Sequence, residues 1–138
     1  MTNVHTGGCR CGAVRFEASA EPFHVSYCHC ADCRKASGAP VSAFVGFKVD
    51  DFSLVGIKGD YVNGTVTRSF CTVCGSPLAY RDTRLPDDIY LTLGAIDRQE
   101  QYVPTLHAWV EQKLPYFHIG DGLPQLERTS VPRADGAI

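Results

Sequence analysis

Seven cysteines carry the clearest chemical signal in this 138-residue chain, because they fall into three short clusters and none lies outside them. Thiols that only fill a core would be scattered along the sequence, and an odd number cannot all pair as internal disulfides. Clustered thiolates are typical of zinc, which binds sulfur at about 2.3 Å in a tetrahedron. We therefore interpret the cysteines as metal ligands, in the clusters Cys9/Cys11, Cys28/Cys30/Cys33 and Cys71/Cys74.

Four of these cysteines form a natural closed set, because a structural zinc takes four protein ligands. The pairs Cys9/Cys11 and Cys71/Cys74 lie about sixty residues apart, so a shared ion would join the start of the chain to its centre. Gly75 follows the second pair, and glycine tolerates the positive φ that lets a chain turn around a metal. We expect this first zinc to support the fold.

The other three cysteines, Cys28, Cys30 and Cys33, lie within six residues. A catalytic zinc takes three protein ligands and leaves one position for water or substrate. We expect this triplet to hold a second zinc with an open fourth position. His29 is a weaker candidate for the fourth ligand, because both of its neighbours are ligands and its ring should point away. The remaining candidates are less specific still: His24, His107 and His118.

Short strands must position these clusters. Thirteen glycines and eight prolines divide the chain into short segments, and only Ala31–Ser37 has a convincing helical pattern, followed by Gly38. Other segments alternate with period two, and Asn63-Gly64 is typical of a two-residue hairpin turn. We predict an all-β fold of about eight to ten short strands with one short helix. A single zinc-binding domain is expected over residues 1–128, and a loose tail over residues 129–138.

Composition limits the function classes. There are 13 basic and 15 acidic side chains, which disfavours a strongly basic nucleic-acid binder and a polybasic membrane-surface protein. No apolar run approaches the ~20 residues needed to cross a bilayer, and the first residues lack the pattern of a secretory signal. We expect a cytoplasmic protein with no nucleic-acid partner and no membrane association. The sequence leaves the oligomeric state open.

The order of the clusters carries a family resemblance. Gly-Gly-Cys-X-Cys-Gly, then Cys-His-Cys-X-X-Cys, then Cys-X-X-Cys-Gly resembles the glutathione-dependent formaldehyde-activating enzyme family, which also includes centromere protein V. The resemblance extends from Gly7 to about Pro124, and it includes the later segments His107-Ala108-Trp109 and Asp121-Gly122-Leu123-Pro124. It implies two coiled antiparallel sheets held by two zinc sites, in a fold shared with a chaperone of Rab GTPases.

The same resemblance assigns a role to each cluster, and this division agrees with the count of four plus three. It implies a structural zinc on the paired cysteines and a catalytic zinc on the triplet. The implied activity is that of a carbon–sulfur lyase, which adds glutathione reversibly to formaldehyde and gives S-hydroxymethylglutathione. The implied ligands are Cys9, Cys11, Cys71 and Cys74 for the structural zinc, and Cys28, Cys30 and Cys33 for the catalytic zinc.

An open three-thiolate zinc suits this chemistry. Metal binding lowers the pKa of an incoming thiol, so that the thiol binds as a thiolate. A thiolate held next to an aldehyde carbon forms a thiohemiacetal, and holding both reactants together supplies a modest acceleration. The expected small-molecule partners are therefore a thiol such as glutathione and a small aldehyde.

Four residues are candidates for binding the thiol substrate. Arg34 and Lys35 directly follow the triplet and could meet a carboxylate, although both are equally well explained as exposed charges. His107 and Trp109 alternate on one predicted strand and could form the wall of a pocket, although core packing is the commoner role of a tryptophan. Asp32 could support the triplet or act as a base, although an acidic residue at a helix N-terminus is common.

Two function classes remain in competition. The first is the zinc-dependent carbon–sulfur lyase. The second is a zinc-stabilised module that binds a protein partner without catalysis, and the shared fold of the Rab chaperone makes it credible. The open triplet favours the enzyme, because a pure binding module would be served by four ligands at each site.

Overall fold

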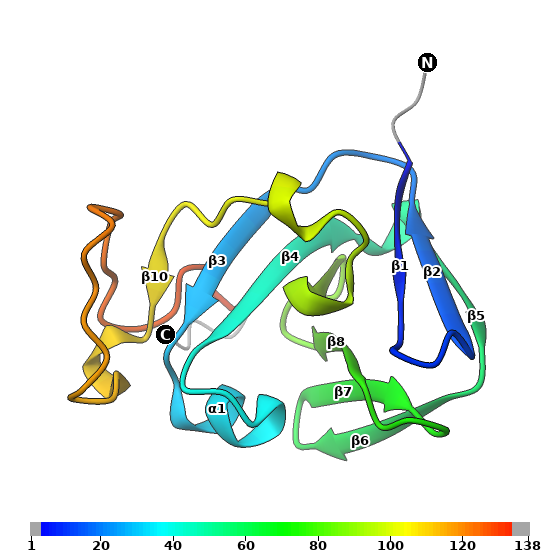
Figure 1. Ribbon diagram of the computed structural model, residues 1–138, viewed down its shortest axis with the longest axis horizontal. Helices are drawn as coiled ribbons and strands as arrows, with labels where there is room; N and C mark the ends of the chain where they lie inside the picture. Colours follow the sequence, from blue (N-terminus) through cyan, green and yellow to red (C-terminus); the bar gives the residue numbers. More distant parts are fainter. Residues whose placement is uncertain (1–3, 134–138) are drawn as a thin grey trace.

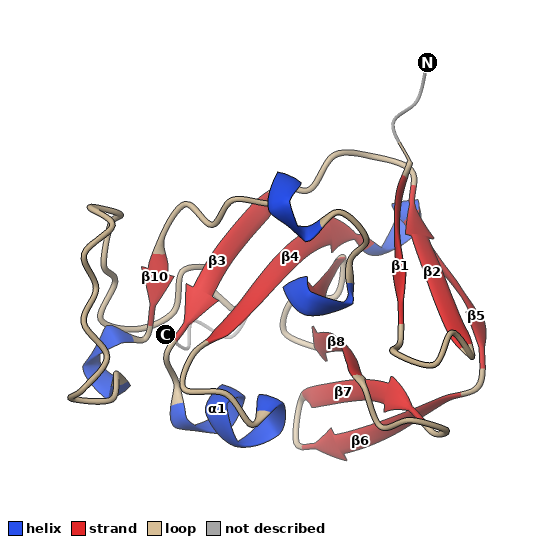
Figure 2. Cartoon of the chain, in the orientation of Figure 1, coloured by secondary structure: helices blue, strands red, loops and turns tan. Residues whose placement is uncertain are grey.

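The computed structural model describes residues 4–133, and over this range the chain forms ten short strands and one α-helix (Figures 1 and 2). No helix in this range is long and apolar enough to span a bilayer. The strands are β1 His5–Gly8, β2 Val14–Ala18, β3 His24–Cys28, β4 Ser42–Lys48, β5 Phe52–Gly56, β6 Lys58–Asn63, β7 Val66–Cys71, β8 Pro77–Asp82, β9 Asp88–Thr92 and β10 His107–Ala108. The helix α1 is Ala31–Ser37, and single 3-10 turns are η1 Val49–Asp51, η2 Leu93–Ala95, η3 Gln99–Gln101 and η4 Val110–Gln112.

The strands form two sheets. A three-stranded sheet has the order β1-β2-β5, and a seven-stranded sheet has the order β10-β3-β4-β9-β8-β7-β6. Every strand pair is antiparallel except β10 with β3, which is parallel. The prediction of an all-β fold with two antiparallel sheets and one short helix is confirmed.

The core lies where the two sheets face each other. In β2, Val14, Phe16 and Ala18 are buried while the residues between them are exposed. This alternation is what a strand with one buried face requires. The inward side chains of β2 join the buried residues of β4 and β9, including Phe47 and Leu91, in one apolar cluster.

The seven-stranded sheet is also covered on its other face. In β9 the run from Asp88 to Leu91 is buried throughout, so Tyr90 is buried although it alternates with the core residues. The Tyr90 ring lies against Phe23 and Tyr80, with centroids 5.9 and 6.1 Å away. This second, aromatic face leads to the end of β3, where the cysteine triplet begins.

Part of the expected tail lies against this aromatic face. Ser130 Oγ is 3.2 Å from His24 Nε2, and Arg133 donates a hydrogen bond of 3.3 Å to the hydroxyl of Tyr80. The Arg133 guanidinium also lies 3.5 Å from Asp82. Residues 129–133 therefore contact the sheet, and residues 134–138 lie outside the described range.

The helix begins and ends where the sequence predicts. Cys30 caps the N-terminus, because its Sγ accepts a hydrogen bond of 3.2 Å from the amide of Cys33. Gly38 ends the helix with φ of 75°, and its amide donates to Arg34 O. Such a left-handed residue is the usual end of a helix, and glycine adopts it without a Cβ penalty.

Two local predictions need correction. The hairpin turn lies one residue later than expected, because Asn63 pairs with Val66 and the two central residues are Gly64 and Thr65. Glycine at the first central position, with φ of 62°, fits a turn of the II′ kind. The strand expected over Leu106–Val110 is only two residues long, since Trp109 turns into the left-handed region with φ of 58° and η4 follows.

Candidate metal centres and active site

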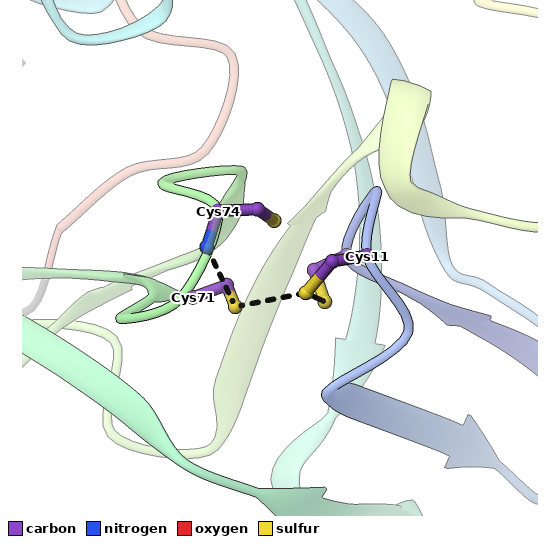
Figure 3. A group of neighbouring side chains, drawn as sticks. Cys11, Cys71 and Cys74 are labelled. Atoms are coloured by element: carbon purple, nitrogen blue, oxygen red, sulfur yellow. Dashed lines mark hydrogen bonds between the residues drawn. The ribbon is translucent and has the colours of Figure 1, made fainter.

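The paired cysteines come together from two distant turns. Cys9 and Cys11 lie in the turn between β1 and β2, while Cys71 ends β7 and Cys74 follows in the next turn. Figure 3 shows the sulfurs of Cys11, Cys71 and Cys74 facing a common centre. The four Sγ atoms lie within 4.8 Å of one another. The structure therefore places these four residues as the sequence predicts.

The spacing of these sulfurs fits a tetrahedral zinc. Zn–S bonds of about 2.3 Å imply sulfur–sulfur edges of about 3.8 Å. The Sγ atoms of Cys9 and Cys11 are 3.6 Å apart, and those of Cys11 and Cys71 are 3.8 Å apart. Backbone amides support the thiolates, since Val14 N donates to Cys9 Sγ at 3.2 Å and Cys74 N donates to Cys71 Sγ at 3.4 Å.

The pKa values of these thiols indicate that all four can ionise together only if a cation is bound among them. Hydrogen bonds from Ser76, first of its side chain and then of its backbone, lower the pKa of Cys74 to about 5. At Cys11 the amide of Ala13 lowers the pKa, but desolvation and the neighbouring sulfurs outweigh it and raise the pKa to about 11. Four adjacent thiolates are not stable together unless a positive ion lies among them. The donor set and its spacing fit a zinc ion.

The cysteine triplet forms where β3 runs into α1. Cys28 is the last residue of β3, Cys30 caps the helix and Cys33 lies in its first turn. Their three Sγ atoms lie within 4.8 Å of one another, and Cys28 and Cys33 are separated by 3.6 Å. This separation again matches the edge of a zinc–sulfur tetrahedron. The structure therefore brings the second predicted set of ligands together.

No fourth protein ligand joins the triplet within residues 4–133, since no histidine or carboxylate atom lies within the same 4.8 Å group. The His29 ring, which the sequence left as a weak candidate, is fully buried and its Nε2 is 2.8 Å from Nδ1 of His107. The ring therefore points away, as expected. Three sulfurs fit a zinc with one position available to an exogenous ligand.

Neighbouring charges act on the triplet. The close sulfurs of Cys28 and Cys33, followed by the Cys33 amide and the Arg68 guanidinium, lower the pKa of Cys30. The sulfurs of Cys30 and Cys33, together with burial, raise the pKa of Cys28. One proton is thus lost readily and the next only with difficulty. A cation that accepts all three thiolates removes this conflict.

A cleft of about 280 Å³ opens beside Cys30. Three guanidinium groups from distant parts of the chain line it: Arg68 from β7, Arg84 after β8, and Arg133 near the C-terminus. Trp109 and Tyr80 line both this cleft and a smaller cavity of about 70 Å³ beside Cys28. The triplet therefore lies between an arginine-rich cleft and an aromatic cavity.

Two carboxylates pair with the arginines, the exposed Asp32 and the buried Asp82. Arg68 pairs with Asp32 at 2.9 Å and its NH2 lies 3.6 Å from Cys33 Sγ. Arg84 pairs with Asp82 at 2.8 Å, and the side chain of Asp82 is fully buried. Arg133 approaches the same carboxylate at 3.5 Å. Three guanidiniums thus line one cleft, and a guanidinium is the side-chain group that best recognises a carboxylate or another planar anion.

The predicted substrate residues are distributed differently. Trp109 lines the cleft beside the triplet. Arg34 lies outside this lining and donates to the carbonyl oxygen of Gln112 at 2.8 Å, and Lys35 is exposed on α1. His107 is buried, and its ring stacks on Tyr27 at 4.7 Å. His107 and Trp109 therefore do not share a strand face, because the left-handed turn at Trp109 separates their side chains.

Sequence reasoning missed the arginines of the cleft. They are separated in the chain, and no spacing pattern connects Arg68, Arg84 and Arg133. Their one shared property, a basic side chain, is common to 13 residues of the chain. Only the pairing of β7 with β8, and the path of residues 129–133 over the sheet, bring them together.

Comparisons with known proteins agree with this geometry. The family described as "Glutathione-dependent formaldehyde-activating enzyme" matches residues 4–112. A protein of Halomonas elongata named "Putative glutathione-dependent formaldehyde-activating enzyme" is 29% identical over 124 residues, which cover 82% of this chain and 79% of that protein. A Schizosaccharomyces pombe protein named as an uncharacterized lyase is 31% identical over 80 residues, which cover 57% of this chain and 58% of that protein.

A solved structure supports the fold. The crystal structure of a Rhodobacter sphaeroides protein superimposes with a TM-score of 0.55, covering 88% of this chain and 98% of that one. The two sequences are 19% identical, so the likeness concerns the fold alone.

Proposed function

Because the chain belongs to the glutathione-dependent formaldehyde-activating enzyme family, we propose that it is a zinc-dependent carbon–sulfur lyase. In this proposal it adds glutathione or a related thiol reversibly to formaldehyde or another small aldehyde. The observation that carries the proposal is the three-sulfur group of Cys28, Cys30 and Cys33, which no fourth ligand completes within residues 4–133. The arginine-rich cleft beside it supports a thiol substrate that bears a carboxylate.

The two cysteine groups would have different tasks. Zinc on the four-cysteine set would support the fold, while zinc on the triplet would supply a position at which a thiol ionises. The sulfurs of the triplet hold that position at the junction of the cleft and the aromatic cavity. The guanidinium of Arg68 keeps Cys33 and Asp32 in place.

The arginines of the cleft would bind the carboxylate of the thiol. Arg84 and Arg133 share the buried Asp82, which holds both guanidiniums at the cleft that they line. A guanidinium binds a carboxylate with paired, charge-assisted hydrogen bonds. Binding the thiol at its carboxylate end holds its sulfur near the triplet and reduces the entropy cost of the reaction.

The proposed reaction balances without an oxidant or a reductant. The thiol gives up its proton, and its sulfur attacks the aldehyde carbon, so that one carbon–sulfur bond forms. The π electrons of the carbonyl move to its oxygen, which takes a proton from solvent. The product is a thiohemiacetal, and the reverse sequence releases both substrates. The walls formed by Trp109 and Tyr80 limit the water around the reacting atoms.

Cobalt substitution tests the proposal. We expect two cobalt ions per chain, and we expect sulfur-to-cobalt charge-transfer absorption at the triplet to rise when glutathione is added. The expected increase is about one thiolate per triplet, because a thiolate completes a four-sulfur shell. A spectrum that ignores every thiol offered would mean that the fourth position is closed, and it would favour the alternative of a zinc-stabilised protein-binding module.

Three matched variants locate the carboxylate site. Arg84→Gln should weaken the glutathione titration and leave the titration with cysteamine, which lacks a carboxylate, unchanged. Arg34→Gln tests the site expected from the sequence on α1. Arg81→Gln is the control, because Arg81 is exposed on β8 and donates to Pro86 O outside the cleft. Loss of glutathione binding with Arg34→Gln alone would place the carboxylate on the helix and refute the role of the cleft.

A further inference from the structure

Three separated sequence motifs meet in one chain of hydrogen bonds, which runs from the partly exposed carboxylate of Asp121 to two buried histidines. Asp121 Oδ2 is 2.8 Å from Nε2 of His107, and Nδ1 of His107 is 2.8 Å from Nε2 of His29. Both histidines are buried, with His29 fully so. These residues come from Cys28-His29-Cys30, His107-Ala108-Trp109 and Asp121-Gly122-Leu123-Pro124, and neither the metal sites nor the cleft uses them.

The backbone holds this chain at several points. The amide of His29 donates to Ala108 O at 3.0 Å, beyond the end of the β3–β10 pairing. The amide of His107 donates to Pro124 O at 2.9 Å. Asp121 Oδ1 accepts from the amide of Leu123 at 3.0 Å, which leaves Oδ2 for His107. The three residues thus join β3, β10 and the loop that follows η4.

Aromatic rings enclose the two imidazoles. Tyr27 stacks on His107 at 4.7 Å, and Phe117 meets the edge of His29 at 5.2 Å. Burying two imidazoles costs desolvation free energy, which burying two apolar side chains would not cost. Hydrogen bonds to the ring nitrogens can offset this cost. Among residues 4–133, Nδ1 of His29 has no hydrogen-bond partner, so the hydrogen bonds found there offset the cost only in part. A structural role in packing alone does not account for the choice of histidine.

His29 lies between two cysteines of the triplet, so the orientation of its backbone also affects the orientation of both cysteine side chains. Cys28 ends a strand, and Cys30 is extended with φ −65° and ψ 147°. In an extended chain alternate side chains point to the same side. Cys28 and Cys30 therefore point together toward the triplet centre, while His29 points to the opposite side. Fixing the His29 ring fixes the direction of both neighbouring sulfurs.

We propose that Asp121, His107 and His29 are positioning residues, whose hydrogen-bond chain holds Cys28 and Cys30 in the geometry that a metal at the triplet requires. This inference rests on the proposed function, since it takes the triplet as a metal site. The carboxylate of Asp121 orients His107, and His107 orients His29. The loop that carries Asp121 is thereby linked to the metal position, although it contributes no ligand. Groups that orient metal ligands in this way typically change metal affinity about 10–100-fold when they are removed.

The first test is Asp121→Asn, which keeps the acceptor for the Leu123 amide and removes the carboxylate charge. We expect cobalt affinity at the triplet to fall about 10–100-fold, while affinity at the four-cysteine set stays unchanged and the melting temperature falls no further than it does in Cys30→Ser, which loses the triplet ion. Competition with a chromophoric chelator measures both affinities. Glu127→Gln is the matched control, because it makes the same chemical change at an exposed position of the same segment and should alter neither site.

A second pair of variants asks whether the chain acts as a unit. The amide of asparagine lies near the position of Nδ1 of histidine, so His107→Asn keeps the link to His29 and breaks the link to Asp121. The amide of glutamine lies near Nε2, so His107→Gln does the reverse. We expect both to weaken the triplet site, with an altered cobalt spectrum. The spectrum is informative because a purely structural role would lower stability without changing the ligand geometry.

The outcomes are distinguishable. Two bound cobalt ions and an unchanged triplet affinity in Asp121→Asn would overturn the positioning role and leave the proposed function intact. Equal losses at both metal sites, or a melting temperature below that of Cys30→Ser, would show that the chain supports the whole fold and would also overturn it. A wild-type protein that binds one cobalt ion would refute the proposed function, and this inference with it.

Discussion

Replacing Cys71 by serine should destabilise the protein far more than replacing Cys30 by serine. Cys71 is fully buried, and a metal shared with Cys11 closes a loop of 60 residues. Cys28 and Cys33, by contrast, are five residues apart. The two ions therefore constrain the unfolded chain to very different extents.

Loop entropy gives the size of this difference. If an ion is treated as a cross-link comparable to a disulfide, closing 60 residues contributes about 4 kcal/mol, and closing five contributes about 2 kcal/mol at most. The short segment is already fixed by β3 and α1, which reduces its contribution further. The entropy of unfolding for a chain of this length is about 0.3 kcal/mol/K. The expected fall in melting temperature is about 14 °C for Cys71→Ser and less than about 7 °C for Cys30→Ser.

Thermal unfolding followed by circular dichroism, with zinc in slight excess, measures both variants. Metal content is determined in parallel, and we expect each variant to lose one ion. Since the total stability of a domain is about 5–15 kcal/mol, Cys71→Ser should also reduce the yield of soluble protein. An unchanged melting temperature for Cys71→Ser, or equal losses for the two variants, would refute the division into a structural and a reactive site.

Two further predictions concern metal release and pH. A chelator should remove metal from the triplet before it removes metal from the four-cysteine set, because three protein ligands bind less tightly than four. A colorimetric assay of released metal should therefore show two phases, and a single phase would contradict this prediction. Burial raises the pKa of Asp82, but hydrogen bonds from Arg84 outweigh it and hold the pKa at about 2. The ionised Asp82 therefore stabilises the fold above its unfolded pKa of about 4, and this contribution is lost as the pH falls toward 2. The difference in free energy of unfolding between the wild type and Asp82→Asn should narrow over that range, and a constant difference would contradict the assignment.

Much of this protein is determined by local sequence. The helix Ala31–Ser37 follows from its local helical pattern and from Gly38, which ends it. Alternation in Val14–Ala18 indicates a strand with one buried face. The grouping of seven cysteines into a set of four and a set of three also follows from spacing, because chelation by neighbouring residues is a short-range property. These features depend on interactions within a few residues, which a sequence displays directly.

Local patterns were less reliable where tertiary contacts competed with them. The hairpin turn at Gly64 is one residue later than the Asn-Gly pattern indicates, because either pair containing this glycine can form a two-residue turn. The strand at His107 ends after two residues, since Trp109 adopts a left-handed conformation that the period-two pattern does not reveal. Both outcomes depend on neighbouring segments that the local sequence does not specify.

The residues around the metal sites were decided by the tertiary structure. Arg68, Arg84 and Arg133 meet in one cleft only because strand pairing and the path of residues 129–133 place them there. Asp121 reaches His107, and through it His29, only because β10 pairs in parallel with β3. The sequence thus determined which residues could bind a metal, because ligand type and spacing are local. Which charges and hydrogen bonds surround that metal was decided by contacts between distant segments, and these depend on the register and twist of the folded sheets.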